Sequence, residues 1–297
     1  MPLCGAGMSG GSSMIQFGYL PSGSLMGLEI EKLCALLGEI GYTGIELLPD
    51  LALVDEAGRR RLLAAVQANG LTISEVVLQR DLVHPDPEQR ERAVRFILDA
   101  IPRVEQLGVN TVNLFTGPEP WIANPIVVGR DVSQTQAWDW VFSAFDRILP
   151  AAEKRHMRLA VENVWGMLAH DLFTHMFLRS RYDSPCLGVN LDPSHDILYG
   201  NTDMRFLVNA WGRDRIFHVH LKDAVGVPEG GRFIFPLLGE GNVNWREFFD
   251  ALDGIGYDGF ASVEFESWQY VNRLAGGDWA QAARVSYDAI QRLTAKG

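Results

Sequence analysis

The sequence predicts a single-domain (β/α)8 barrel, the closed parallel barrel also called a TIM barrel. From residue 15 onward, short apolar segments rich in β-branched residues alternate with longer segments of helical spacing, eight of each. Alternation of this kind produces parallel strands joined by right-handed crossovers. The length of 297 residues fits one such barrel, which typically takes about 250 residues. No break in composition divides the chain.

The predicted strands are short runs of mostly apolar residues, as expected for strands buried inside an α/β protein. In chain order they are Ile15–Leu20, Gly44–Pro49, Thr72–Leu78, Thr111–Thr116, Arg158–Val164, Leu187–Asp192, Ile216–Lys222 and Gly259–Phe265.

The predicted helices carry apolar residues at helical spacing, and glycine follows several of them as a stop signal, as at Gly41, Gly70 and Gly108. In chain order they are Glu29–Ile40, Val54–Asn69, Pro87–Leu107, Val132–Arg155, His170–Arg179, Met204–Ala210, Asn244–Gly256 and Asp278–Thr294.

A doubly wound open sheet is the rival architecture, but such sheets usually carry a glycine-rich phosphate loop after the first strand. Here the first strand is followed by Pro21-Ser22-Gly23-Ser24, which lacks that pattern. Residues 1–14 are rich in Gly and Ser, have no secretory signal pattern, and are predicted to be a disordered tail. The barrel is therefore assigned to residues 15–297.

Composition excludes several classes of function. The net charge is 26 − 37 = −11, and an acidic chain repels nucleic-acid phosphates, so no nucleic-acid partner is expected. No apolar run reaches 18 residues, so no membrane span is expected. The three cysteines (Cys4, Cys34 and Cys186) are far apart and odd in number. They predict neither a disulfide framework nor a thiolate zinc site, and a cytoplasmic location is the expectation.

Four predicted strands end in groups that can bind a metal: Glu162, Asp192, His220 and Glu264. The carboxyl ends of the strands form the catalytic face of a barrel. Side chains alternate between the two faces of a strand, and an unpaired charge turned outward toward the helices would be costly to bury. Turned inward, three carboxylates and one imidazole predict a site for one divalent cation. They suit Mn²⁺, Mg²⁺ or Co²⁺, and less selectively Zn²⁺.

Each of these residues has a simpler explanation when taken alone. Glu162 could be a solvated rim residue or a helix cap. Asp192, which precedes Pro193, could form an Asx turn. His220 could be a hydrogen-bonded interior histidine. The four together, one on each of four successive strands, favour the metal site.

Six short segments occur in a characteristic order along the chain: Gly44-Ile45-Glu46-Leu47, Val161-Glu162-Asn163, Leu191-Asp192-Pro193-Ser194-His195, His218-Val219-His220-Leu221-Lys222-Asp223, Leu238-Gly239-Glu240-Gly241 and Val263-Glu264-Phe265-Glu266. Together they resemble the xylose-isomerase-like sugar isomerase/epimerase superfamily, which includes ketose 3-epimerases, hydroxypyruvate isomerase, inosose dehydratase and endonuclease IV. The resemblance implies a barrel with a divalent metal, Mn²⁺ foremost, held by Glu162, Asp192, His220 and Glu264, and a substrate contact at His195.

Two positions depart from the ketose 3-epimerase pattern. Leu168 stands where those enzymes carry a substrate-binding Glu, and Gly226 stands where they carry an Arg. Lys222-Asp223 follows His220 instead, as in dehydratase-like members. A plain ketohexose 3-epimerase is therefore disfavoured. Endonuclease chemistry needs more histidines and a basic surface, which the net charge opposes.

The expected chemistry is proton transfer beside a carbonyl through a metal-stabilised enediolate of a keto-sugar or keto-polyol. Glu162 and Glu264 would serve as base and acid, while His195 and Lys222 hold the oxygen that gains charge. Loss of a leaving group from the same intermediate would make the protein a lyase, such as an inosose or keto-sugar dehydratase or an enzyme that cleaves a 3-keto-glycoside. A homo-oligomer is left open. Further substrate contacts are predicted at Glu46, Asn113 and Trp165.

Overall fold

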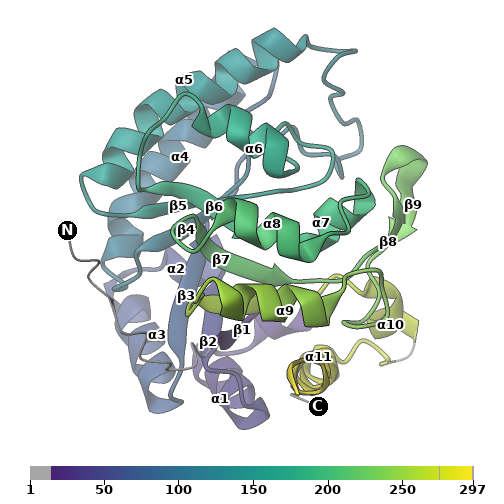
Figure 1. Ribbon diagram of the computed structural model, residues 1–297. Helices are drawn as coiled ribbons and strands as arrows, with labels where there is room; N and C mark the ends of the chain where they lie inside the picture. Colours follow the sequence, from purple (N-terminus) through teal and green to yellow (C-terminus); the bar gives the residue numbers. More distant parts are fainter. Residues whose placement is uncertain (1–14, 274, 296–297) are drawn as a thin grey trace, which may run out of the picture.

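The computed structural model describes residues 15–273 and 275–295, and its centre is a closed barrel of eight parallel strands (Figure 1). The strands follow the order β1-β10-β7-β6-β5-β4-β3-β2 around the barrel. The predicted fold class is confirmed. The barrel strands are β1 (Gln16–Leu20), β2 (Gly44–Leu47), β3 (Thr72–Val77), β4 (Thr111–Leu114), β5 (Arg158–Glu162), β6 (Leu187–Leu191), β7 (Ile216–Leu221) and β10 (Phe260–Glu264).

The barrel strands are buried on both faces, which explains their nearly continuous apolar sequences. Every residue of β6 and β7 is buried. Register brings the functional ends together: Glu162 of β5 pairs with Asn190 of β6, and Leu20 of β1 pairs with Glu264 of β10. The carboxyl ends of the strands therefore open on one common mouth.

Helices surround the barrel (Figure 1). Their N-termini are capped by short polar side chains that accept backbone N–H bonds, such as Asp55, Ser133 and Asp278. The longer ones are α1 (Ile30–Ile40), α3 (Glu56–Ala68), α4 (Pro87–Glu105), α5 (Gln134–Glu153), α6 (Leu172–Arg179), α8 (Met204–Trp211), α9 (Trp245–Gly254) and α11 (Trp279–Thr294). They match the eight predicted helices to within about two residues at most of their ends.

Three short helices and a hairpin, apart from Pro49 at the end of a predicted strand, lie between the elements that the sequence predicts. The helices are α2 (Pro49–Ala52), α7 (Pro193–Leu198) and α10 (Trp268–Arg273). The hairpin consists of β8 (Val225–Val227) and β9 (Arg232–Ile234), an antiparallel pair that projects from the end of β7. These pieces are too short for periodicity to reveal them.

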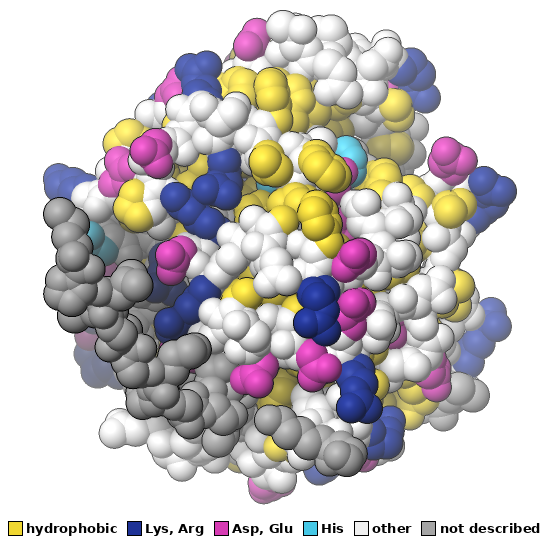
Figure 2. Space-filling model, in the orientation of Figure 1, with side chains coloured by type: hydrophobic (Ala, Val, Ile, Leu, Met, Phe, Trp, Pro, Cys, Tyr) yellow, Lys and Arg dark blue, Asp and Glu magenta, His cyan; other side chains and the backbone are white. Residues whose placement is uncertain are grey.

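The surface mixes both signs of charge. On the face in Figure 2, Lys and Arg side chains are interspersed with Asp and Glu rather than gathered into one basic patch. Among the described residues, no helix is both long and apolar enough to cross a bilayer. Cys34 and Cys186 are free thiols. The predicted disordered tail, residues 1–14, lies outside the described residues.

The buried His175 of α6 predicts a pH-dependent stability. Its ring packs edge-on against Trp211 at 5.3 Å, and burial lowers the pKa of His175 from 6.5 to about 3. The unfolded chain takes up a proton below pH 6.5 and the folded chain does not. This contribution to the free energy of unfolding therefore falls by about 1.4 kcal/mol per pH unit from pH 6.5 down to about pH 3. Between pH 7 and pH 5, the free energy of unfolding measured with urea should fall by about 2 kcal/mol more in the wild type than in His175→Leu. Equal losses in the two proteins would contradict the assignment.

Candidate functional site

The mouth of the barrel holds a cavity of about 590 Å³. It has carboxylates, an imidazole and an ammonium at its base and aromatic rings around its rim. Its lining residues are Gln79, Trp121, Glu162, Val164, Trp165, His195, Lys222, Phe233, Ile234, Phe235, Glu264, Glu266, Trp268 and Gln269.

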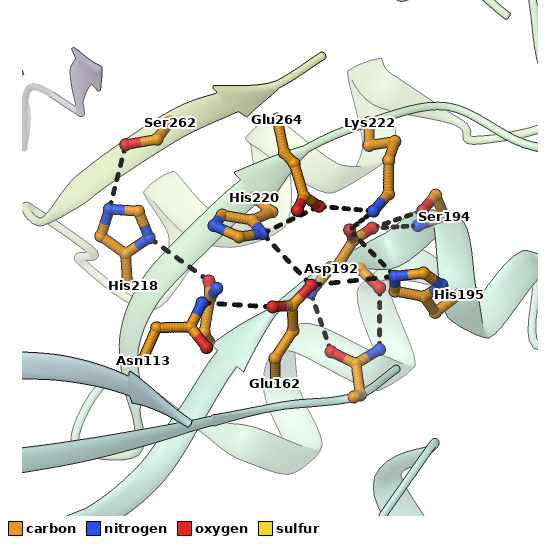
Figure 3. Close-up of polar contacts among 12 residues, drawn as sticks. Asn113, Glu162, Asp192, Ser194, His195, His218, His220, Lys222, Ser262 and Glu264 are labelled. Carbon is orange, nitrogen blue, oxygen red and sulfur yellow. Dashed lines mark hydrogen bonds and ion pairs between the residues drawn. The ribbon is translucent and has the colours of Figure 1, made fainter. Parts of the chain in front are cut away.

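At the base of the cavity, Glu162, Asp192, His195 and Glu264 form a group that we call the outer cluster. Each offers a ligand atom, and these atoms lie within 4.8 Å of one another. Figure 3 shows their side chains pointing toward one another from the ends of β5 and β10 and from the start of α7. His195 Nε2 lies 3.5 Å from Asp192 Oδ2 and 3.8 Å from Glu162 Oε1. The structure brings three of the four predicted ligands, Glu162, Asp192 and Glu264, together with His195. Metal binding by these residues stays a prediction.

Asp192 both caps a helix and faces the site. Its Oδ1 accepts hydrogen bonds from the backbone N (2.8 Å) and the hydroxyl (2.6 Å) of Ser194, which fixes the start of α7. Asn163 holds the Asp192 backbone from both sides, because its amide donates to the Asp192 carbonyl and its oxygen accepts from the Asp192 N–H. These contacts leave Oδ2 directed into the outer cluster. The Asx-type cap and the predicted ligand are therefore both compatible with one side chain.

His220, the predicted imidazole ligand, lies between two groups of carboxylates. Its Nδ1 is 3.2 Å from Glu162 Oε1 and 3.2 Å from Glu264 Oε2, and its Nε2 is 3.1 Å from Glu46 Oε1. Burial opposes a charge on His220, but the three carboxylates outweigh burial and raise its pKa well above the usual value. By distance, His195 is the imidazole that belongs to the outer cluster. His220 lies deeper in the barrel and contacts Glu162 and Glu264 of that cluster. Ligation by His220 stays a prediction.

Lys222 lies among the carboxylates of the mouth. Its Nζ is 2.5 Å from Glu264 Oε2, 3.1 Å from Asp192 Oδ2 and 3.1 Å from Glu266 Oε2. Burial disfavours the ammonium, but these carboxylates outweigh burial and raise the pKa of Lys222 well above its ordinary value. The side chain is therefore a fixed positive charge at the base of the cavity.

The two carboxyl groups proposed for proton transfer have pKa values shifted in opposite directions. Burial raises the pKa of Glu162. Burial acts the same way on Glu264, but Lys222 and His220 outweigh it and hold the pKa of Glu264 well below its usual range. Carboxyl groups whose surroundings push their pKa values apart are typical of paired acid and base catalysts.

The outer cluster fits a divalent cation. Asp192 Oδ2 is buried and makes no well-formed hydrogen bond, although Lys222 lies nearby. Buried carboxylate oxygens need a proton donor or a cation. Three carboxylates with one imidazole are the donor set expected for Mn²⁺, Mg²⁺, Co²⁺ or Zn²⁺.

The predicted substrate contacts fall at different depths. Trp165, His195 and Lys222 line the cavity, whereas Glu46 and Asn113 are fully buried beneath it. Asn113 donates a hydrogen bond of 3.1 Å to Glu162 Oε2 and so orients that carboxylate. As substrate ligands, these five residues stay predictions.

Sequence reasoning missed Gln79, which lines the cavity just beyond β3. Its Nε2 donates to Glu162 Oε2 (2.6 Å) and to Asn113 Oδ1 (3.0 Å). Its position directly beyond a strand end, as for the predicted ligands, was the available signal.

Aromatic side chains form the upper wall of the cavity. The ring of Phe233 packs edge-on against Trp165 at 4.8 Å and contacts Phe235 at 5.3 Å. Phe235 in turn lies 5.7 Å from the His195 ring and 4.8 Å from Lys222 Nζ. The segment that carries β9 therefore reaches from the rim to the base of the site.

Asp223, the residue after Lys222, organises the loop that follows the hairpin. Its buried carboxylate accepts five hydrogen bonds of 2.9–3.1 Å. The sequence placed it in a motif without assigning a role, and the structure assigns it the positioning of this loop. The five donors are the backbone N–H groups of Ala224, Gly239, Gly241 and Val243 and the indole Nε1 of Trp245.

The fold and the site together define a class of protein: a single-domain (β/α)8 barrel with a carboxylate–imidazole cluster at its catalytic mouth. The chain belongs to the xylose isomerase-like TIM barrel family, whose model matches residues 34–292.

Curated relatives match parts of the chain. The uncharacterized protein MJ1311 of Methanocaldococcus jannaschii is 29% identical over 181 residues, which are 59% of this chain and 57% of that protein. The probable endonuclease 4 of Acholeplasma laidlawii is 27% identical over 107 residues, 35% of this chain and 33% of that protein. The chain thus spans less than two thirds of either relative.

Solved structures of similar fold cover 94% of the chain. They include D-psicose 3-epimerase from Clostridium cellulolyticum H10 (TM-score 0.71, 16% identity, 98% of that chain). The 3-keto-D-glucoside 4-epimerase YcjR from E. coli has a TM-score of 0.71 at 15% identity over 99% of its chain. The IolI protein with a bound zinc atom has a TM-score of 0.72 at 15% identity over 98% of its chain. At these identities the likeness concerns the fold.

Proposed function

We propose that the protein is a divalent-metal-dependent isomerase or epimerase of a keto-sugar or keto-polyol. The observation that carries the proposal is the outer cluster, because the buried Glu162 and Asp192 and the partly buried Glu264 meet an imidazole at the base of a cavity large enough for a sugar. The sugar epimerases among the structures of similar fold support it. Mn²⁺ is the proposed metal, and a cytoplasmic location and a homo-oligomer stay predictions.

Proton transfer is assigned to Glu162 and Glu264. When bound, a divalent cation would polarise a sugar carbonyl and stabilise negative charge on its oxygen. The two carboxyl groups come from β5 and β10, which are separated by β6 and β7 around the barrel. They therefore approach a substrate from two sides. One removes a proton from the carbon and the other returns a proton to the opposite face, which inverts the stereocentre.

His195 and Lys222 are proposed to bind the substrate oxygens. Burial, followed by the Lys222 charge, lowers the pKa of His195 to about 3. The ring is therefore neutral, and one of its nitrogens can donate a hydrogen bond. The Lys222 ammonium would stabilise an oxygen that gains charge.

The rim of the cavity suits a sugar without phosphate groups. Sugars present apolar C–H faces that pack on aromatic rings, which Trp165, Phe233 and Trp268 would supply. Among the described residues that line the cavity, Lys222 is the only Lys or Arg, and carboxylates already surround it. A phosphate would lack a cationic partner there.

A lyase is the second candidate, and Glu266 favours it. This half-buried carboxyl group lies 3.1 Å from Lys222 Nζ, and burial raises its pKa to about 7. A carboxyl group that is partly protonated at neutral pH can donate a proton to a leaving group. Glu266 would thus protonate the departing oxygen, as water or as the aglycone of a 3-keto-glycoside, once the neighbouring carbon of the substrate has given up its proton.

The test combines metal analysis with solvent exchange. The purified chain, supplied with Mn²⁺ in D₂O, would be incubated with ketoses, inososes and 3-keto-glycosides, and the products analysed by NMR and mass spectrometry. Deuterium incorporation without loss of water supports the isomerase or epimerase. Loss of water or of an aglycone supports the lyase instead. No exchange and no turnover over the whole panel would contradict both.

A further inference from the structure

A second group of metal-binding side chains lies inside the barrel beneath the outer cluster. Glu46 of β2, Glu75 of β3 and His218 and His220 of β7 each offer a ligand atom, and these atoms lie within 4.8 Å of one another. All four side chains are at most 1% exposed. We call this group the inner cluster.

Glu75 points to a missing positive partner. Both of its carboxylate oxygens are buried and neither makes a hydrogen bond in the described structure. Its polar neighbours are the His218 ring, whose Nδ1 lies 3.2 Å from Glu75 Oε1, His220 Nε2 at 3.9 Å, and the Asn113 side chain. A buried, uncompensated carboxylate costs several kcal/mol, so a cation or a proton must accompany it.

The donor set favours a cation. Two carboxylates balance the charge of one divalent ion, and two imidazoles complete a four-ligand set of the kind that Zn²⁺ takes. Zinc–ligand distances of about 2.0–2.2 Å place tetrahedral ligands about 3.4 Å apart. The closest pairs, His220 Nε2 to Glu46 Oε1 at 3.1 Å and His218 Nδ1 to Glu75 Oε1 at 3.2 Å, are near that spacing.

Hydrogen bonds already orient both imidazoles for this role. His218 Nε2 contacts Ser262 Oγ at 3.1 Å (Figure 3). Its other nitrogen, Nδ1, lies 3.2 Å from Glu75 Oε1 and 3.3 Å from Asn190 Oδ1. His220 Nδ1 contacts Glu162 and Glu264, so Nε2 is turned toward Glu46. A ligand histidine whose other nitrogen bonds an oxygen is the usual arrangement in metal sites.

We propose that Glu46, Glu75, His218 and His220 form a second, inner site for a divalent cation, with Zn²⁺ as the best fit. His220 gives Nε2 to the inner ion, and its Nδ1 contacts the Glu162 and Glu264 carboxylates of the outer cluster, which is proposed to hold an ion of its own. The inner site does not depend on the proposed function.

The experiment measures metal content. The full-length chain is stripped with a chelator, reloaded with Zn²⁺, separated from free metal by gel filtration and analysed by plasma mass spectrometry. The wild type is expected to hold two ions per chain, and Glu75→Gln and Asp192→Asn are each expected to hold one. The control Glu240→Gln, an exposed carboxylate, keeps two.

The same variants separate a cation from a proton. The melting temperature with and without Zn²⁺ is measured as well. Gln mimics a protonated Glu75. If a proton occupies the inner cluster, Glu75→Gln therefore leaves both the metal content and the zinc-dependent rise in melting temperature unchanged. That result would overturn the proposal, and His218→Asn repeats the test if Glu75→Gln fails to fold. Another result would also overturn the inner site: the wild type holds one ion, and only Asp192→Asn loses it. That result leaves the proposed function intact. One ion that only Glu75→Gln removes supports the inner site and contradicts the outer one.

Discussion

Glu162→Gln is expected to slow solvent-proton exchange on the epimer whose proton Glu162 removes by about 10²–10⁴-fold while keeping its fold. The amide cannot take up or release the proton that the carboxyl group transfers. It has the same shape, and its oxygen can still accept the hydrogen bonds from Gln79 and Asn113. The measurement is the rate of deuterium incorporation into the substrate identified by the panel, with urea unfolding as the check on folding.

Two further variants sharpen this result. Glu240→Gln removes the same charge from an exposed loop position and should keep the wild-type rate. Glu264→Gln should still exchange the proton of one epimer but fail to invert it, because only one face of the substrate keeps its carboxyl group. A well-folded Glu162→Gln protein with more than a tenth of the wild-type exchange rate would contradict the assignment.

The second large effect is on stability. Asp223→Asn is expected to lower the free energy of unfolding by about 3 kcal/mol or more, because the amide offers one acceptor oxygen to five converging donors and turns its own N–H groups toward some of them. Each buried donor left unpaired costs about 1–3 kcal/mol. Urea unfolding at constant pH measures the loss, and a loss under 1 kcal/mol would show that the loop does not depend on Asp223.

A glycine pair provides the matched control for the same loop. A Cβ added at Gly241 would lie 2.1 Å from Asp223 Oδ1, so Gly241→Ala must displace the carboxylate or the loop and should destabilise the protein. A Cβ at Gly254, at the exposed end of α9, meets nothing within 4 Å. Gly254→Ala should therefore be neutral or stabilising by up to about 1 kcal/mol. Equal effects of the two substitutions would argue against a role of the Asp223 hydrogen bonds in holding this loop.

The fold was predictable because its signals are local. The alternation of apolar runs and amphipathic segments, with capping residues such as Asp278 and stop residues such as Gly41, marks each element within a few positions of its ends. The parallel βα rule then orders the strands. The sequence did not predict the hairpin of β8 and β9, because its two three-residue strands are too short to show a period.

The sequence by itself determined the barrel and the convergence of Glu162, Asp192 and Glu264 at its mouth, since strand order and alternation decide which side chains face inward at which end. Only the tertiary structure decided how deep each inward side chain lies. Depth depends on barrel closure and on the stagger between strands, which bring residues far apart in the chain to the same level. That is why His195 joins the outer carboxylates, His218 and Glu75 meet below them, and His220 touches both groups.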